Sequence, residues 1–425
     1  MYLEKIEDPR NTSLGVANVG SILNKYKSSD EIWRTALNIS KNKKIFLQLH
    51  KQMFTNRKTY GIIISRKIKR RCFCVGNVYL VIDLKTFFAS VECAERGLDP
   101  FTTNLVVADP RRGNGSVCLA ITPAMKNLGI RNRCRVYEIP KNLKYIMAVP
   151  RMSKYMEYSA NIYGIYLKYI SKDDIYPYSI DECFIDVTHY LKLYKMNAME
   201  LAKTMMKDIL DTYKITATCG IGNNMYLAKI ALDILSKHSP TNIAWLNEEK
   251  YIKTLGDHKP ITDFWGVGKG TANRLKKMGI FTMNEVARCS EKRLYKEFGI
   301  NARFLIDHSK GLETCTIADI KDYKPKTTSY SNSQILFKDY NYESARLIVK
   351  EMVELLSQKL IENNKKAGVI RLYIGYSKDV IKSTGGSRKL TNPSNLYTNL
   401  VFEFMQLFDQ TTDKDTPIRK VRNKF

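Results

Sequence analysis

The sequence lacks the features of a membrane or secreted protein. It contains no run of about 18 consecutive apolar residues, the length that a membrane-spanning helix requires. Its first residues, MYLEKIEDPRN, are polar and mixed in charge, unlike a secretory signal. The nine cysteines are scattered, and the only close pair, Cys72 and Cys74, has no second pair or His cluster to complete a zinc site. We therefore expect reduced thiols, a cytoplasmic location and no membrane partner.

Acidic residues are scarce relative to basic ones. The sequence has 42 Asp and Glu against 69 Lys and Arg, a formal net charge of +27. This excess favours a polyanionic partner, with nucleic acid first and an anionic membrane second, although a merely soluble basic protein has the same composition. Acids that do cluster in so basic a chain are therefore informative.

Two acidic clusters occur at the ends or turns of strand-like segments. Asp83 closes the apolar run VYLVI (78–82), and Asp181 and Glu182 lie in YSIDECFIDV (178–187), which predicts a hairpin with the acidic pair at its bend. Buried apolar strands rarely carry acids unless something compensates the charge. A hard cation such as Mg²⁺ binds carboxylate and phosphate oxygens together. The alternative is that these acids face solvent at strand ends.

The order of patterns predicts a multidomain α+β protein. From residue 77, strand-like and helix-like segments alternate, which indicates a sheet covered by helices. A chain of this length should hold more than one domain. Residues 241–318 are predicted to be helical with short loops, and 319–326 a polar linker. In the α+β domain that follows, the Gly/Ser segment 383–388 predicts a turn.

The segment DFWGVGKG (263–270) precedes a helical pattern with Lys and Arg on its open face. A Gly-x-Gly turn leading into a helix exposes backbone N–H groups that can hold a phosphate. We interpret this segment as part of a helix-hairpin-helix that binds DNA without regard to sequence; a plain helical turn is the alternative. The proposed DNA-binding residues are Gly266, Gly268, Lys269 and Gly270.

Several strings taken together resemble the Y-family, or translesion, DNA polymerases, most closely the UmuC-like branch of Gram-positive bacteria and their mobile elements. They are YSIDE (178–182), CGIGNN (219–224), LAKIA (227–231) and DFWGVG (263–268). The resemblance covers roughly residues 77–425 and implies a right-hand polymerase. It places the palm at 77–95 and 153–240, the fingers at 96–152, the thumb at 241–318, the linker at 319–326 and the little finger at 327–425. Residues 1–76 form an N-terminal extension outside the resemblance, and we assign it no role.

The resemblance implies the catalytic and metal-binding residues. Asp83, Asp181 and Glu182 match the metal carboxylates, and the backbone carbonyl of Leu84 matches a further ligand. The implied cofactor is a pair of Mg²⁺ ions, with Mn²⁺ as an alternative, which would clamp the attacking and leaving oxygens of an in-line displacement. Asp186, in the same hairpin, is expected to be structural.

The resemblance also implies the substrate-binding residues. Phe88 matches an aromatic steric gate that excludes a ribose 2′-hydroxyl, whereas its pattern alone predicts a core residue. Phe87 is expected to pack under the nascent base pair. Lys126 and Lys237 match cations that contact the incoming triphosphate; simple solvation is the alternative for both. Pro123 stands where many relatives have a phosphate-bonding tyrosine, so this contact must differ.

We therefore expect a template-directed, low-fidelity DNA polymerase that inserts deoxynucleotides opposite damaged bases, as in SOS-type DNA repair. Its partners would be primer-template DNA and deoxynucleoside triphosphates. One alternative is a catalytically impaired relative that occupies primer-template without efficient synthesis. A metal-dependent nuclease is a further alternative, but it needs no residue such as Phe88 and would cluster a His or Lys base beside its acids.

The C-terminal residues predict little use of a sliding clamp. Residues 410–425 contain no Gln-x-x-Leu-x-Phe-type peptide, and the helical pattern around Gln406 predicts that Leu407 and Phe408 are buried. The basic ending, RKVRNKF (419–425), is expected to pair as a strand at the edge of the little-finger sheet. We expect a distributive enzyme as a result, because a clamp tethers only a peptide that can reach it.

Overall fold

The computed structural model describes residues 77–325, 328–377 and 381–425. The described residues fall into a first unit that ends at Tyr323 and a second unit that begins at Lys324. The N-terminal extension predicted at residues 1–76 lies outside the described residues.

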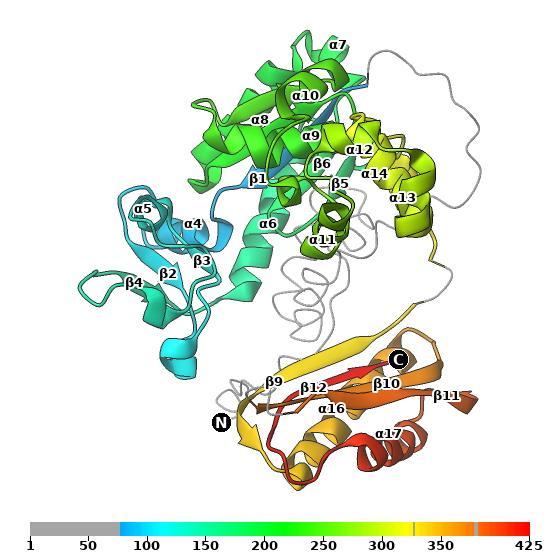
Figure 1. The fold of residues 1–425 in the computed structure, drawn as a ribbon. Coiled ribbons are helices and arrows are strands. Elements are labelled where there is room, and N and C mark those ends of the chain that lie inside the picture. The colour runs from blue at the N-terminus through cyan, green and yellow to red at the C-terminus, as the bar shows by residue number, and fades with distance from the viewer. Residues whose placement is uncertain (1–76, 326–327, 378–380) are drawn as a thin grey trace. The chain divides into compact units, whose positions relative to one another are not determined.

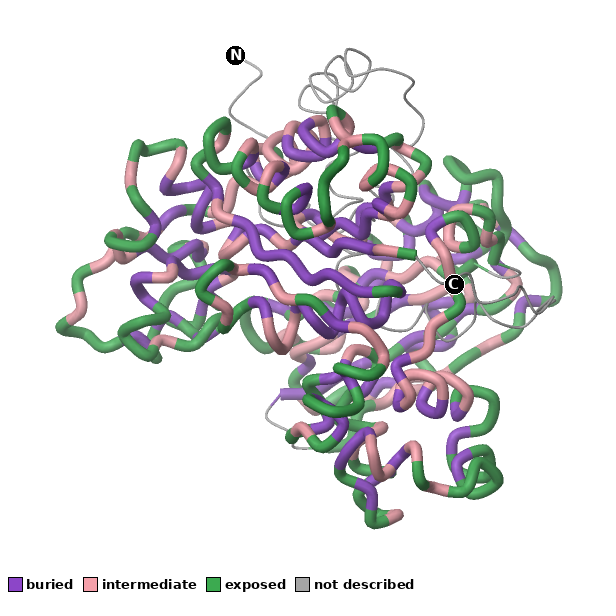
Figure 2. The backbone as a smooth tube through the Cα atoms, turned by 90° about the horizontal axis from the view of Figure 1, so that it is seen from above, coloured by how far each residue is buried: buried purple, intermediate pink, exposed green. Residues whose placement is uncertain are grey.

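A five-stranded sheet with strand order β5-β6-β1-β7-β8 forms the centre of the first unit (Figure 1). The central strand pairs antiparallel with β6 and β7, while β8 runs parallel to β7. The strands are β1 (Tyr79–Leu84), β5 (Ile175–Pro177), β6 (Glu182–Asp186), β7 (Ala217–Gly222) and β8 (Ile243–Leu246). Because β1 is covered on both faces, its apolar run is almost continuous, and Figure 2 shows such buried runs through the interior of the chain.

Helix α9 (Met225–Ile230) lies directly on β7, and two glycines permit this approach. A Cβ on Gly220 would stand 2.0 Å from the carbonyl oxygen of Ala228, and a Cβ on Gly222 would stand 2.3 Å from the Ala228 nitrogen. Helix α6 (Met152–Leu167) packs against α8 (Ala198–Tyr213), and α8 in turn contacts β7. The CGIG string is therefore a packing surface for α9.

Residues between α4 (Phe87–Ala94) and α6 form a separate small sheet of order β3-β2-β4. Its strands are β2 (Leu105–Val107), β3 (Ala120–Ile121) and β4 (Ile146–Ala148), and the short helix α5 (Pro123–Asn127) follows β3. Eight buried residues, among them Val106, Ile121 and Met125, give this segment its own core. Within the first unit, this segment is inserted between α4 and α6.

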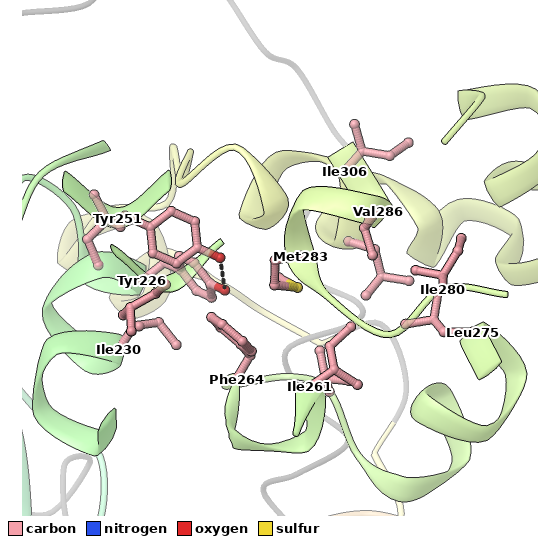
Figure 3. Packing of buried hydrophobic residues seen from close by; sticks show 14 of the residues in the cluster. Tyr226, Ile230, Tyr251, Ile261, Phe264, Leu275, Ile280, Met283, Val286 and Ile306 are labelled. Atoms are coloured by element: carbon pink, nitrogen blue, oxygen red, sulfur yellow. Dashed lines mark hydrogen bonds between the residues drawn. The ribbon is translucent and has the colours of Figure 1, made fainter. Parts of the chain in front are cut away.

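A layer of helices, called the helical layer, follows the sheet in the sequence. Its helices are α10 (Glu248–Leu255), α11 (Lys269–Lys277), α12 (Met283–Arg288), α13 (Glu291–Phe298), α14 (Ala302–Ser309) and α15 (Ile317–Asp322). Tyr226 and Ile230 of α9 share one apolar cluster with helices α10 to α14, and Figure 3 shows Met283 between the aromatic and aliphatic members. The hydroxyls of Tyr226 and Tyr251 are 3.2 Å apart. Helix α9 thus joins the sheet to the helical layer.

Two predictions for this region were wrong. The stretch 241–318 is not wholly helical, because Ile243–Leu246 form strand β8 at the edge of the sheet. The first half of the predicted linker 319–326 belongs to α15, whose first residue, Ile317, is buried against Tyr79 and Phe184. That apolar anchor precedes the charged residues and gives the helix one buried face.

The second unit is a four-stranded antiparallel sheet of order β11-β10-β12-β9 packed against two helices. Its strands are β9 (Ser331–Tyr340), β10 (Ala367–Tyr376), β11 (Thr384–Ser394) and β12 (Ile418–Lys424), and its helices are α16 (Tyr342–Glu362) and α17 (Tyr397–Thr411). The turn predicted at 383–388 is wrong, because residues 384–388 pair with β10 as part of β11. The terminal strand was predicted correctly, but it lies between β10 and β9 and not at the sheet edge. Leu407 and Phe408 are buried as predicted.

Among the described residues, none of the helices combines the length and the apolar character needed to cross a bilayer.

We expect Gly220→Ala to destabilise the first unit by about 3 kcal/mol or more, because backbone atoms of α9 cannot move away from the new Cβ without separating helix and sheet. Urea unfolding followed by circular dichroism measures this loss. The matched control is Gly164→Ala in α6, where an added Cβ meets nothing within 4 Å among the described residues. That helical glycine should gain about 0.5 kcal/mol, and equal effects at the two positions would contradict the packing argument.

Candidate active site

The predicted acids meet at one end of the central strand. Asp83 lies directly opposite Glu182 in the β1–β6 pairing, and the backbone N–H of Leu84 donates to the carbonyl oxygen of Asp181 at 2.9 Å. The bend that carries Asp181 is closed by the N–H of Tyr178, which donates to the carbonyl oxygen of Glu182 at 2.8 Å. Residues that pair directly across two strands point to the same face. Asp83 and Glu182 therefore share the face covered by α9.

Burial and mutual repulsion oppose ionisation of the Asp83 and Glu182 carboxyls. Burial, followed by the charges of Asp181 and Glu182, raises the pKa of Asp83 well above its usual range. Burial also raises the pKa of Glu182, although Lys229 acts in the opposite direction. Removing carboxylates from water while placing them beside one another is costly unless a cation offsets the charge.

These residues fit a hard divalent cation by donor type and by charge. Their oxygens are the ligands that Mg²⁺ prefers, and crowded acids are what a divalent ion compensates. Within the described ranges, no group of three or more Asp, Glu, His or Cys side chains stands close enough together to form a finished metal cage. In the structure the Glu182 carboxylate is instead paired with a lysine, and the Ser179 hydroxyl donates to Asp181 Oδ1 at 2.5 Å.

A row of charges on one side of α9 and its continuation surrounds the acids. Lys229 Nζ lies 2.7 Å from Glu182 Oε1 and 3.0 Å from Asp233 Oδ2. Lys237 Nζ lies 3.1 Å from Asp233 Oδ1 and 3.8 Å from Asp83 Oδ2. Lys237 was predicted from the sequence, whereas Lys229 and Asp233 were not. Their spacing of four residues along a helical segment was the available signal, but it is equally typical of a solvated helix face.

Lys126 approaches the acids from helix α5. Burial lowers the pKa of this lysine, the charge of Asp83 acts to raise it, and the neighbouring charges of Lys237 and Lys85 lower it further. Lys126 and Lys237 therefore lie within electrostatic reach of the same carboxylate. Pro123 occupies the first turn of α5, where proline is tolerated because the first N–H of a helix has no intrahelical partner.

The two phenylalanines after Asp83 have different environments. Phe87 is buried, with 3 % of its surface exposed. Phe88 is half-buried, and its ring stacks on that of Tyr155 with centroids 4.4 Å apart and planes inclined by 15°. The turn from β1 into α4 is tight, since Thr86 has a φ of 47° and the Ser90 hydroxyl donates to the Lys85 carbonyl at 2.7 Å.

The predicted phosphate-binding turn is attached to the acidic hairpin. Phe264 and Val267 are buried, and the Trp265 indole N–H donates to the Tyr178 hydroxyl at 3.3 Å. Gly266 has a φ of 90°, which favours glycine. Helix α11 begins at Lys269 with Gly268 as its N-cap, and a glycine offers no side chain to the free N–H groups of the first turn. Gly268, Lys269 and Gly270 are exposed.

Comparisons with known proteins cover both units. The impB/mucB/samB family model matches residues 82–233, and the model of that family's C-terminal domain matches 327–423. The chain is 31 % identical over 360 residues to DNA polymerase IV 2 of Bacillus subtilis (strain 168), covering 81 % of this chain and 82 % of that protein. It is 31 % identical over 204 residues to the DNA repair protein homolog YobH of the same organism, covering 48 % of this chain and 92 % of that protein. Among solved structures, the Y-family DNA polymerase chimera Dbh-Dpo4(243-245)-Dbh superposes with a TM-score of 0.63 at 19 % identity, covering 82 % of this chain and 98 % of that one, which shows the fold.

We expect Lys229→Met to lower the free energy of unfolding by about 3 kcal/mol at neutral pH without metal, because it leaves the buried Glu182 carboxylate unpaired. Since the folded pKa of Glu182 is raised, the uncompensated acid protonates as the pH falls, and the deficit should shrink at acidic pH and be greatest at alkaline pH. Urea titrations in chelator at several pH values measure this. Lys207→Met, which breaks the exposed pair with Asp211, is the control and should change stability little; a pH-independent deficit for Lys229→Met would contradict the prediction.

Proposed function

The chain belongs to the impB/mucB/samB family of Y-family DNA polymerases and is a DNA-directed DNA polymerase, and from this premise we propose that it inserts deoxynucleotides opposite damaged template bases with low fidelity. The observation that carries the proposal is the pairing of Asp83 with Glu182 across β1 and β6, with Asp181 in the adjoining bend. In nucleotidyl transfer, a cluster of carboxylates on the protein serves to hold the metal ions that contact the triphosphate.

Asp83, Asp181, Glu182 and the Leu84 carbonyl are the residues that would hold two divalent ions, Mg²⁺ or Mn²⁺. When bound, such ions supply Lewis-acid activation of the primer 3′-hydroxyl and neutralise the triphosphate. The chain's own part is to hold four oxygen donors at the end of a rigid central strand. Burial of Glu182 and the repulsion between neighbouring acids support this assignment, because acids that repel one another bind a cation strongly.

Lys126 and Lys237 would contact the phosphates of the incoming nucleotide. Both lie within electrostatic reach of Asp83, so a triphosphate at the acids would be adjacent to both ammonium groups. The alternative of simple solvation is less favourable for Lys237, whose ammonium group already pairs with Asp233. Lys229, buried between Glu182 and Asp233, would orient the acid and not bind substrate.

Two surfaces would bind DNA without reading its sequence. The first is the exposed turn with Gly266, Gly268, Lys269 and Gly270, whose free backbone N–H groups suit a phosphate. The second is the face of the sheet in the second unit that lies opposite to α16 and α17. Its members are Arg371, Tyr373, Lys420, Arg422 and Lys424. Tyr373 pairs with Arg422 and Arg371 with Lys424, whereas the alternate residues Ile370, Leu372 and Ile374 are buried.

The division into domains is part of this proposal. The five-stranded sheet would be the palm (77–95 and 153–240), the small sheet segment the fingers (96–152), the helical layer the thumb (241–318) and the second unit the little finger (327–425). Strand β8 pairs with β7, so the palm sheet would extend beyond residue 240 to Leu246.

Asp181→Ala is expected to abolish single-nucleotide primer extension in Mg²⁺ and leave primer-template affinity nearly unchanged, because it removes a metal donor and no phosphate contact. Extension opposite an abasic site beside an undamaged template, together with a fluorescence anisotropy titration, measures both properties. Asp211→Asn, an exposed acid on α8, is the control. Incorporation by Asp181→Ala within about tenfold of the unchanged protein would refute the assignment.

Phe88→Ala is expected to admit ribonucleotides while deoxynucleotide insertion remains measurable, because the ring would no longer meet the 2′-hydroxyl. The quantity to measure is the ratio of kcat/KM for a deoxynucleotide to that for the matching ribonucleotide. Phe87→Leu serves as the comparison, since Phe87 is buried. An unchanged ratio in Phe88→Ala would mean that Phe88 is a core residue and not a gate.

A further inference from the structure

Two pairs of residues face each other where the small sheet segment joins the rest of the first unit. Phe88 and Glu92 lie one helical turn apart on α4, and Arg151 and Tyr155 lie one turn apart at the start of α6. Residues four apart share one side of a helix. Figure 1 shows α4 beside α6, and the two helices are in contact.

The contacts connect all four residues. The Phe88 ring lies flat on the Tyr155 ring, the Tyr155 hydroxyl donates to Glu92 Oε1 at 2.7 Å, and the Arg151 guanidinium donates through Nε and Nη2 to the two Glu92 oxygens, each at 2.9 Å. Arg96 also donates to Glu92. A bidentate arginine–carboxylate pair restricts both side chains to one geometry.

The carboxylate at the centre of this network is completely buried. Glu92 and Tyr155 are both 0 % exposed, so neither side chain has room to adopt another rotamer without leaving a buried polar group unpaired. By contrast, Phe88 is half-buried and has one ring face against Tyr155. The orientation of the half-buried Phe88 ring is therefore determined by the buried Tyr155 ring.

We propose that Tyr155 and Glu92 are positioning residues for sugar selection: Tyr155 sets the plane of the Phe88 ring, and Glu92 holds Tyr155 through its hydroxyl. The inference rests on the proposed role of Phe88 as the gate. It extends that role, because a gate excludes a single hydroxyl only if its ring cannot tilt or withdraw.

The same network closes the base of the small sheet segment. Glu92 and Arg151 are 59 residues apart in sequence, and the chain between them forms that segment. Arg151 immediately precedes α6, whose first turn also carries Tyr155. A displacement of the segment that disturbs Arg151 would therefore reach the Phe88 ring through Glu92 and Tyr155.

The test compares sugar discrimination in two Tyr155 variants. Tyr155→Leu removes the stacked ring and should lower the deoxy-to-ribo ratio of kcat/KM about fivefold, the factor expected for loss of an aromatic pair. Tyr155→Phe keeps the ring but loses the hydroxyl tie to Glu92, and it should lower the ratio by a smaller factor, about threefold. If Tyr155→Leu does not fold, Tyr155→Phe decides.

Tyr163→Phe is the matched control. Tyr163 lies on the same helix and is 1 % exposed, but among the described residues its hydroxyl has no hydrogen-bond partner. Loss of this hydroxyl should leave the ratio unchanged. A Tyr155→Phe ratio equal to that of Tyr163→Phe would overturn the proposal.

A double-mutant cycle distinguishes positioning from a general structural effect. If Tyr155 acts through the gate, Tyr155→Phe should not change the ratio further in a Phe88→Ala background. A further fall there would overturn the proposal and leave the gate intact. If Phe88→Ala itself leaves the ratio unchanged, the gate assignment fails, and the Tyr155 inference fails with it. This outcome is distinguishable from a further fall in the double variant, which would overturn only the Tyr155 inference.

Discussion

A carboxylate that is removed from water needs an opposite charge or hydrogen bonds to offset its own charge. Strand β1 places the carboxylate of Asp83 opposite that of Glu182 on β6. Several elements of the first unit supply these charges and hydrogen bonds. Lys229 comes from α9, Asp233 and Lys237 from its continuation, and the bend with Asp181 is attached by Trp265 to the helical layer. Each of these elements contributes a charge or a hydrogen bond near the end of one strand, where the proposed metal site lies.

Close packing makes that charge arrangement possible. Lys229 reaches Glu182 only because α9 lies almost in contact with the backbone of β7, and this requires the absence of side chains at Gly220 and Gly222. The opposite side of α9 supplies Tyr226 and Ile230 to the core of the helical layer. One short helix therefore orients the acid, covers the sheet and anchors the next layer. The continuation of α9 is a π-helical segment, Ala231–Leu235, a form that often occurs at functional sites.

A second buried carboxylate, Glu92, organises the other side of the site in a different way. Its charge is offset by two arginines and a tyrosine, so it needs no metal. These bonds lower the pKa of Glu92 although burial alone would raise it. The contrast with Asp83 is physical: Glu92 is fully paired with donors, while Asp83 lies beside two other acids and is suited to a cation.

The sequence by itself determined the kinds of local element that carry the candidate site residues. Asp83 after an apolar run, the YSIDE bend and the Gly-x-Gly turn are local patterns, and the structure places each on the predicted type of element. It did not reveal Lys229 and Asp233 as site residues, because charges four apart also occur on any solvated helix. Strand β11 and the central place of β12 were equally hidden, since pairing depends on residues far apart in sequence and not on local propensity. Only the tertiary structure decided which charges meet, because burial and cross-strand neighbours, not the residues alone, determine whether an acid is solvated, paired or available to a metal.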